Sequence, residues 1–454
     1  MKKVVLLFIS LSALLFAQQP DTIISIIDPG NRPGTDFTSL QAWADARAGD
    51  LTLRNTIEVA KCRCTNGKAD TAANISKFIT DSTHYIKIYT DTTEGFRHQG
   101  IYPSDSSNVY RIEDSLNYSS LLQVITSKVI IDGICFKVIK GNGNAITLTD
   151  CRCGGYVEGC LIERNKDSLD EHGHGIRIDA ATKPAEYYIR NNIIYGFKND
   201  SLYTAPNCGI LTYPTGDSLR AFIDNNTIYY CKYGIWNRNY NPSIVTARNN
   251  LIQNCIGGNF YVTEQYTKNS TNNISSDTTA PAFGKYWRNT IVAFMDTANR
   301  DFHLIKSSVP ATGNGIDLSH DLFDPFNTDV DGEIRIKPWD IGADNLNDTS
   351  KITGVNNIIT LNSDNQDPKS FSLSNYPNPF NPATTISYKI NSGGRIKLII
   401  YDILGKEIQR LVDEWQSAGV HTVSFDGSKL PSGVYVYELL SSNFIACKKM
   451  MLVK

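Results

Sequence analysis

The middle of the chain repeats a short pattern built around a pair of asparagines. Three copies align on this pair: IRNNIIYGF from Ile189, IDNNTIYYC from Ile223 and ARNNLIQNC from Ala247. The pairs lie 34 and 24 residues apart, and a glycine follows each copy, at Gly209, Gly234 and Gly258. A period near 24 residues, made of short strands and Asn or Gly turns, indicates a solenoid.

Among solenoids, a right-handed parallel β-helix fits this period best, so the expected fold class is all-β. Each coil of such a helix holds three short strands, and neighbouring coils lie about 4.8 Å apart, so residues at the same coil position stack. We therefore expect Asn191, Asn225 and Asn249 to form a ladder in which each side-chain amide bonds to the next. Cys231 and Cys255 occupy equivalent positions, which predicts buried, stacked thiols rather than a metal or redox site.

The repeat resembles the pectate-lyase-like β-helix superfamily over roughly residues 20–345, through its architecture rather than through a catalytic motif. Both ends of a solenoid need covering, because exposed strand edges promote aggregation. TSLQAWADARAGD predicts a short helix over the first coil, capped by Thr38 or Ser39 and ended by Gly49. DFHLIKSSVPATGNGIDLSHD and DVDGEIRIKPWDIGADN resemble the closing segment of exported bacterial β-helices.

Two neighbouring coils carry insertions at the same position. The interval from the asparagine position to the next glycine is 9 residues in the last two coils, 18 in the coil of Asn191 and 16 in the coil of Gly159. The extra residues fall at about 165–171 and 198–206. Insertions in stacked coils lie side by side and often form a binding face.

These insertions supply the candidate catalytic residues. They are Asp170, Glu171, His172, His174, Arg177 and Lys198. His172 or His174 would act as a general base, while Lys198 or Arg177 would stabilise developing charge. The alternative for His174 is a stacked coil position followed by a turn glycine, because it aligns with Cys208 and Tyr233.

A weaker metal signal lies in the sequence NTDVDG, residues 327–332. Asp329 and Asp331 resemble the first half of a calcium loop, with oxygen donors at alternate residues before a glycine. The acidic residue that such a loop needs six positions later is replaced by Pro338, so an Asp/Gly-rich turn is the preferred interpretation. We predict no cofactor and keep Ca²⁺ as the alternative.

Both termini carry export features. Lys2 and Lys3 precede an apolar run, which predicts a secretory signal peptide over residues 1–17. No later stretch is apolar enough to span a bilayer, so we expect no transmembrane segment in the mature chain. A net charge of −2 argues against a nucleic-acid partner. The β-helix is expected over 18–345, a linker over 346–370 and a β-sandwich over 371–454.

The last block resembles the type A C-terminal sorting domain of the type IX secretion system. YPNPFNPATTISY, YDILGKEIQRLVD, LPSGVYVYEL and a terminal KKMMLVK carry the resemblance, in that order. It implies that the secretion machinery and its sortase are partners, and that the chain passes through the periplasm to the cell surface or extracellular space. The residues matching the family motifs are Pro377, Asn378, Pro379, Gly433, Tyr435, Lys449 and Lys454.

Two functions remain open for the β-helical part. It is either a carbohydrate-binding or adhesin-like surface protein, or a polysaccharide lyase or glycoside hydrolase. We favour the first, because no catalytic motif is complete and a fold alone does not imply an activity.

Overall fold

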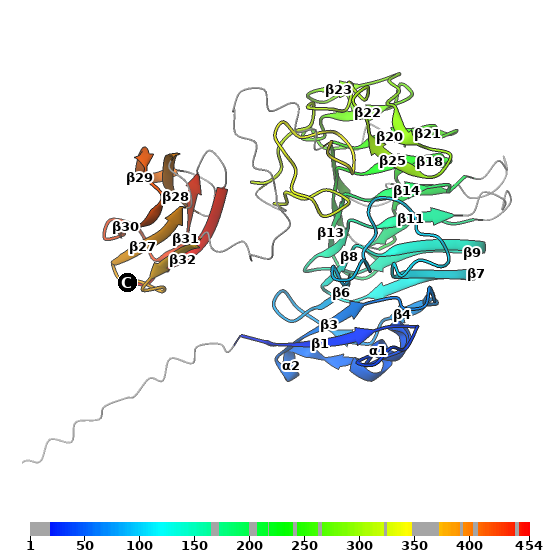
Figure 1. The fold of residues 1–454 in the computed structure, drawn as a ribbon, viewed down its shortest axis with the longest axis horizontal. Coiled ribbons are helices and arrows are strands. Elements are labelled where there is room, and N and C mark those ends of the chain that lie inside the picture. Colours follow the sequence, from blue (N-terminus) through cyan, green and yellow to red (C-terminus); the bar gives the residue numbers. More distant parts are fainter. Residues whose placement is uncertain are drawn as a thin grey trace, which may run out of the picture. The chain divides into compact units, whose positions relative to one another are not determined.

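The computed structural model describes residues 19–164, 172–198, 207–216, 218–238, 243–261, 266–321, 325–346, 372–390, 394–402, 407–440 and 445–454. The chain divides into two compact units, Met1–Thr349 and Ser350–Lys454, and each is described by itself. Both are built almost entirely of strands (Figure 1), which confirms the all-β prediction.

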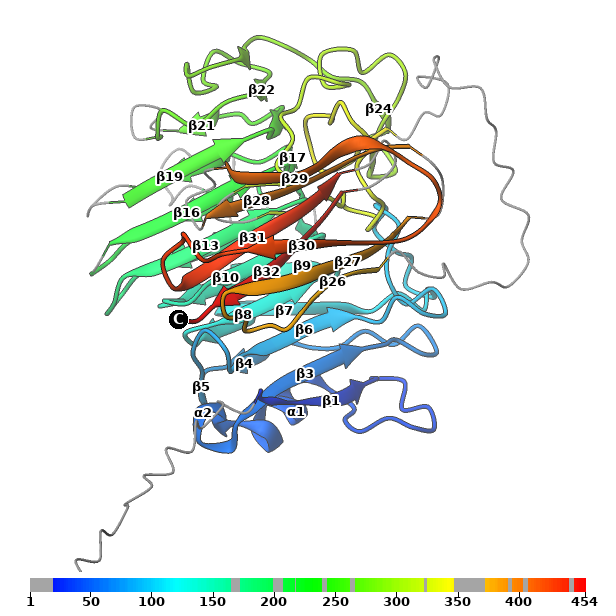
Figure 2. The same ribbon diagram turned by 90° about the vertical axis from the view of Figure 1, so that its left-hand side faces the viewer.

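The first unit is a solenoid of parallel strands. Its first sheet has eight strands in the order β1 (Asp21–Ile27), β3 (Thr56–Cys62), β6 (Ile86–Thr90), β8 (Val129–Asp132), β10 (Gly155–Glu158), β13 (Ala185–Arg190), β16 (Leu219–Asp224) and β19 (Ser243–Arg248). Figure 2 shows these strands stacked one above another from β1 to β19. Sequence order and sheet order agree because each coil contributes one strand.

The other two sides of the coils belong to one larger sheet that is folded at the long strand β9 (Cys135–Thr149). Its first arm contains β11 (Leu161–Arg164), β14 (Ile193–Tyr195), β17 (Thr227–Tyr229), β20 (Leu251–Gln253), β22 (Asn273–Ser275) and β23 (Tyr286–Trp287). Its second arm contains β12 (Ile176–Asp179), β15 (Cys208–Thr212), β18 (Tyr233–Asn237) and β21 (Gly258–Tyr261). Two further strands join this sheet, β7 (Arg111–Ile125) beside β9, and β4 (Ala73–Ile75) beside β7.

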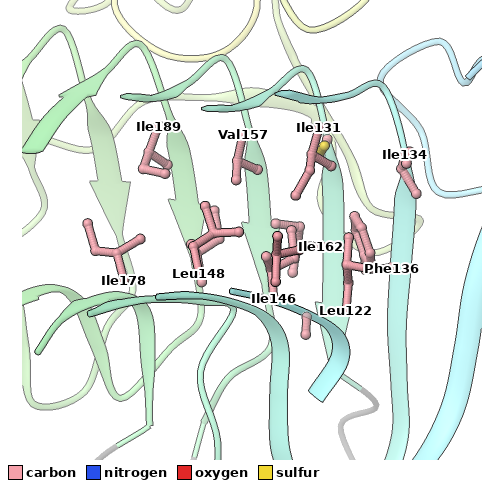
Figure 3. Close-up of a cluster of buried hydrophobic side chains, with 14 of the residues drawn as sticks. Leu122, Ile131, Ile134, Phe136, Ile146, Leu148, Val157, Ile162, Ile178 and Ile189 are labelled. Carbon is pink, nitrogen blue, oxygen red and sulfur yellow. The ribbon is translucent and has the colours of Figure 1, made fainter. Parts of the chain in front are cut away.

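The interior of the coils is a continuous column of aliphatic side chains. Figure 3 shows Val157 and Ile189 of the first sheet pointing toward Leu148 and Ile178 of the folded sheet. Strand register places Val157 beside Ile189, so residues of one kind stack from coil to coil. A fully buried aliphatic side chain of this size contributes about 1.5–3 kcal/mol, which makes this column the main source of stability.

The predicted N-terminal lid is present. Helix α1 (Leu40–Arg47) starts at Ser39, whose side chain accepts a hydrogen bond from the Ala42 amide, and it buries Leu40 and Trp43. Short elements complete this end: β2 (Gly49–Asp50), α2 (Leu51–Arg54) and β5 (Phe78–Ile79). The closing segment (residues 300–346) does not cover the other end as expected: it lies along the side of the coils and packs Phe302 and Ile341 on the outside of the first arm. It begins with β25 (Asp301–Leu304), which pairs with β24 (Phe294–Asp296).

The asparagine ladder is present one residue later than predicted. It consists of Asn192, Asn226, Asn250 and Asn273, and each Nδ2 donates to the Oδ1 of the next asparagine at 3.0 Å. Of the predicted ladder, the structure contains the bond from Asn249 Nδ2 to Asn225 Oδ1, at 3.1 Å. The first asparagine of each pair adopts a left-handed conformation, with φ of 53–55°. That conformation directs the second asparagine inward.

The first asparagines bind the closing segment instead. Asn225 Nδ2 donates to Gly342 O at 3.2 Å, and Asn249 Nδ2 donates to Ile316 O at 2.8 Å. Asn191 accepts from Arg335 Nη2 at 2.8 Å. The two residues of each pair therefore have separate roles. The second asparagine forms the ladder inside the coils, and the first binds the closing segment.

The nine cysteines whose side chains the structure describes are unbridged thiols of the solenoid. Burial raises the pKa of Cys160 to about 12 and that of Cys64 to about 11. Cys231 is buried and Cys255 is half-buried one coil later, as expected from their spacing.

The second unit is an antiparallel β-sandwich. One sheet contains β26 (Ser372–Tyr376), β27 (Ala383–Ile390) and β30 (Gly419–Asp426). The other contains β29 (Glu407–Gln416), β28 (Gly394–Asp402), β31 (Gly433–Leu440) and β32 (Ile445–Leu452). Its core includes Tyr388, Ile400, Phe425 and Tyr437, all buried.

Candidate functional site

The two insertions lie mostly outside the described residues, and so do Asp170 and Glu171. Their anchors are described. Strand β11, before the first insertion, pairs with β14, before the second, and β12 pairs with β15 after them. Both insertions therefore start and end on neighbouring coils.

The two candidate histidines follow the first insertion. The backbone amides of His172 and His174 donate to Asn142 Oδ1 at 2.6 Å and to Asn144 Oδ1 at 3.0 Å. His174 Nδ1 accepts from the Cys208 amide at 3.2 Å, which ties it to the next coil. Burial, with added repulsion from Arg177, lowers the pKa of His174 to about 3. His174 is therefore a neutral ring stacked between coils.

The candidate cations lie on different parts of the coils, Arg177 in the second arm and Lys198 at the corner between the two arms. Arg177 in β12 forms an ion pair with Asp179 at 3.1 Å and places its guanidinium 4.4 Å from the centre of the Tyr213 ring. Lys198 donates to Tyr230 Oη at 3.2 Å. Arg177 thus continues into an aromatic surface, whereas Lys198 binds a tyrosine at the corner between the arms.

That aromatic surface is a feature that the sequence reasoning missed. We call it the outer strip, and it consists of Arg177, Tyr213, Tyr233, Trp236, Arg238 and Tyr261.

Arginine and aromatic groups alternate along the outer strip. The Arg238 guanidinium lies 4.7 Å from the Tyr213 ring centre and 5.2 Å from that of Trp236. Trp236 and Tyr261 are 5.5 Å apart, and Tyr233 lies 4.4 Å from Tyr261. Cation–π contacts of this kind hold aromatic faces in place at a partly exposed surface.

Strand register explains the outer strip. Arg177, Leu211, Trp236 and Tyr261 pair in sequence across β12, β15, β18 and β21. Each directly follows an inward-facing apolar residue (Ile176, Ile210, Ile235 or Phe260), so all four side chains lie on the outer side of the coils, where Leu211 is buried among its neighbours. The signal that could have found them is this position in the repeat, counted from the turn glycine.

A polar pocket of about 680 Å³ lies beneath the closing segment at the asparagine side of the coils. Arg97 and Arg190 line it, held by Asp132 at 2.7 Å and Glu158 at 2.5 Å. Phe326 of the closing segment stacks on Arg190 at 4.9 Å. We call this space the closing-segment pocket.

The predicted calcium candidates line the same pocket. Asp329 Oδ1 accepts from the amides of Asp331 at 3.1 Å and Glu333 at 2.9 Å, so Asp329 closes a tight turn. Burial raises the pKa of Asp329 to about 7; Asp331 adds to the rise, and Arg335 opposes it. Asp331 projects from that turn toward His303, with 3.1 Å between Oδ2 and Nε2.

In the second unit, the proline-rich entry segment pairs with the last strand. Prolines cannot donate backbone hydrogen bonds. The residues between them form the bonds instead: Asn378 Oδ1 accepts from the Met451 amide at 2.9 Å, and the Phe380 amide donates to Met451 O at 2.8 Å. Pro377 O accepts from Thr384 Oγ1 at 2.8 Å. Pro377–Asn378–Pro379 is therefore hydrogen-bonded both to Thr384, near the start of the domain, and to Met451, near its end.

The other motif residues lie in the last two strands of the domain or directly after them. Gly433 begins β31, and the buried Tyr435 donates from Oη to Pro431 O at 2.9 Å. The Lys454 amide donates to Ser432 Oγ at 3.0 Å, and its Nζ donates to Ser428 O. Lys449 lies in β32.

Comparison with known proteins identifies the second unit. Residues 374–454 match the family model of the secretion system C-terminal sorting domain. No curated protein and no solved structure matches the chain, so the resemblance to the pectate-lyase-like superfamily stays a prediction. Within the described residues, no helix has the length and apolar character needed to cross a membrane. The sorting domain marks the chain as a type IX secretion cargo that is exported to the cell surface or extracellular space.

Proposed function

We propose that the solenoid of this exported protein binds an acidic polysaccharide along the outer strip. The observation that carries the proposal is the run of aromatic and arginine side chains across β12, β15, β18 and β21.

Strand geometry suits a linear polymer. Neighbouring coils are about 4.8 Å apart, a spacing comparable with the length of one pyranose unit. Trp236 and Tyr261 lie in successive coils, with their ring planes at 75° to each other. Aromatic faces pack on the apolar faces of sugar rings and bury area from water.

The charge of the outer strip favours an acidic chain. Arg177 and Arg238 flank Tyr213, and Asp179 pairs with one of them. A guanidinium donates to a carboxylate through two parallel hydrogen bonds, which adds affinity and direction. Uronic-acid polymers carry the carboxylates that this arrangement would bind.

The test measures binding by the protein without its signal peptide (residues 18–454) to uronic-acid and neutral polysaccharides. We expect Trp236→Ala and Tyr261→Ala each to weaken binding at least about tenfold, equivalent to about 1.4 kcal/mol. Arg238→Gln should weaken binding of acidic polymers more than binding of neutral ones. Calorimetry or affinity electrophoresis supplies the measurement.

Tyr286→Ala is the matched control. Tyr286 is 42 % exposed on β23 and lies beneath Arg288 at 5.1 Å, so it repeats the same chemistry away from the outer strip. Equal losses in Tyr286→Ala and Trp236→Ala, or no binding to any polymer, would overturn the proposal. New unsaturated or reducing ends, lost in His172→Ala or His174→Ala, would instead establish the lyase or hydrolase alternative.

A further inference from the structure

A second cluster of chemically active groups lies in the closing segment, away from the outer strip. His303, Asp331 and Asp344 each offer one ligand atom, and these atoms lie within 4.8 Å of one another. The three residues come from β25, from the turn closed by Asp329, and from the end of the closing segment.

The histidine ring is oriented by a fourth residue. His303 Nδ1 lies 2.6 Å from Asp301 Oδ1, which fixes the proton on Nδ1 when the ring is neutral. The lone pair of Nε2 then faces Asp331, at 3.1 Å from Oδ2. Metal-binding histidines usually donate their other ring nitrogen to a carboxylate in this way.

One carboxylate oxygen of the cluster has no hydrogen-bond partner. Asp331 Oδ1 is buried without a hydrogen bond. A protonated His303 would satisfy Asp301 and Asp331 Oδ2 and would leave Asp331 Oδ1 unpaired. A buried unpaired carboxylate oxygen is costly, and a further cation beside Asp331 would satisfy it.

The backbone leaves room beside the cluster. Gly100 has φ of 66°, and a Cβ there would lie 2.8 Å from Asp331 Oδ1 and closer still to His303 Nε2. Any side chain at this position would fill the space next to both ligand atoms. The closing-segment pocket, which Asp331 and Gly332 line, connects the cluster with solvent.

We propose that His303, Asp331 and Asp344 bind a divalent transition-metal ion, Zn²⁺ being the probe of choice, and that Asp301 positions His303. An imidazole nitrogen with carboxylate oxygens suits Zn²⁺, whereas Ca²⁺ prefers a shell made only of oxygens. The ion is structural: it joins three separated parts of the closing segment and thereby holds the cover on the first arm.

Three carboxylates lie together at the cluster: Asp331 and Asp344 as ligands, and Asp301 beside the histidine. Of the guanidinium groups nearby, Arg335 donates to the carbonyls of Gly342 and Ala343, and Arg97 pairs with Asp132. A bound divalent ion would offset the charge of the three carboxylates directly.

The test uses the protein of residues 18–454 after dialysis against a chelator. Calorimetric titration with Zn²⁺ should give one site per chain, and the melting temperature should rise with Zn²⁺ because the ion binds the folded state. X-ray absorption at the zinc edge should show one imidazole among oxygen ligands. Asp331→Asn should abolish the site, and Asp301→Asn should weaken it about 10- to 100-fold.

His84→Asn is the matched control. His84 Nδ1 lies 3.0 Å from Asp81, as His303 lies beside Asp301, but the ring's Nε2 faces Asn55 rather than a second carboxylate. Zn²⁺ binding should be unchanged in this variant. Because Asp331→Asn could fail to fold, the absorption spectrum of the wild type tests the ligands independently.

Four results would overturn the proposal. The first three are the absence of a stoichiometric Zn²⁺ site in the wild type, a zinc spectrum without imidazole, and a site that His84→Asn removes. The fourth is binding of Ca²⁺ in place of Zn²⁺, which would support the oxygen-only loop around Asp329 and Asp331.

Discussion

The coils of the solenoid turn at two corners that differ sharply. At the asparagine corner, between the first sheet and the first arm, successive coils turn through the same Asn–Asn pair and share a buried ladder. At the loop corner, between the first and second arms, one coil holds nine residues more than the next over the same interval. Both corners belong to the same coils, yet one is uniform and the other is not.

The difference follows from hydrogen bonding. A buried side-chain amide must find partners, and in the ladder those partners are the asparagines of the neighbouring coils. An inserted residue at this corner would break bonds in two coils at once. The described residues of the loop corner form no such ladder, so the chain can insert residues there. The outer strip begins beside the loop corner, where inserted residues have little effect on stability.

The largest effect on the asparagine corner is expected from removing one asparagine of the ladder. Asn226 Nδ2 donates to Ile189 O and Asn250 Oδ1, and Asn226 Oδ1 accepts from the Asn192 backbone and side chain. Asn226→Ala leaves several buried groups unpaired, and we expect it to lower the free energy of unfolding by about 4 kcal/mol. Thermal and urea unfolding measure the loss.

Asn299→Ala is the control for this variant. Asn299 is exposed and bonds to Asp296 within its own turn, so its removal should cost less than about 0.5 kcal/mol. Similar losses in the two variants would show that the ladder is not what makes the asparagine corner uniform.

The next test concerns the cover of the same corner. Arg335 is fully buried and donates to Asn191 Oδ1 and to the carbonyls of Thr328, Gly342 and Ala343. Arg335→Met should cost about 3 kcal/mol, because these acceptors lose their donor. Limited proteolysis should then cut the closing segment before the coils.

Lys337→Met is the companion variant. Lys337 is half-exposed and pairs with Asp317 at 2.5 Å, a surface ion pair that contributes at most about 1 kcal/mol. If Arg335→Met and the wild type resist proteolysis equally, Arg335 does not hold the closing segment against the coils.

The sequence predicts the solenoid well, because the repeat of the Asn pair is kept in the coils whose core is uniform. The sequence-based prediction puts the ladder one residue early, because the spacing of the asparagines gives the position in the coil but not the direction of the side chain. That direction depends on the left-handed φ of Asn191, Asn225 and Asn249. Asn and Gly are the residues that tolerate this conformation, so the first residue of each pair was the better candidate for the turn than for the ladder.

The sites were harder to predict than the fold. Trp236 and Tyr261 are ordinary strand residues until register shows that they share one outward column. His303, Asp331 and Asp344 lie up to 41 residues apart outside the repeat, where no period relates them. The sorting domain was found from sequence because its motifs are contiguous and occur in a fixed order.

Acid should weaken the asparagine corner through His98. Its Nε2 donates to Gly159 O at 2.7 Å, and its Nδ1 accepts from the Gly100 amide at 3.2 Å, so the ring is neutral. Burial, with repulsion from Arg97, lowers the pKa of His98 to about 4, while Asp331 and Asp132 oppose this shift. The unfolded chain protonates near pH 6.5 and the folded chain near pH 4, so stability falls as the pH drops through this window.

The expected loss is at most about 3 kcal/mol, since one pKa unit corresponds to about 1.36 kcal/mol. His98→Gln should be less stable than the wild type at pH 7, because it loses two good hydrogen bonds. The gap between the two proteins should narrow from pH 7 to pH 4.5. Unfolding curves that stay parallel over this range would contradict the assignment of His98 as a buried neutral ring.

The smallest effect is expected at the loop corner. Asn207 Nδ2 lies 3.5 Å from Lys198 O, so a Gly-Gly bridge in place of residues 199–206 can join the two anchors. In the next coil, Cys231, Lys232 and Tyr233 make this turn without inserted residues. Shortening a loop changes its closure entropy only slightly, and we expect the free energy of unfolding to change by less than about 1 kcal/mol.

The same variant separates folding from function at this corner. If the insertion serves binding, affinity for polysaccharide falls while the unfolding curve stays in place. The matched experiment inserts Gly-Gly between Asn225 and Asn226, where it should cost as much as losing one asparagine of the ladder. Equal destabilisation by the deletion at the loop corner and the insertion at the asparagine corner would show that hydrogen-bonded stacking does not set which corner can vary.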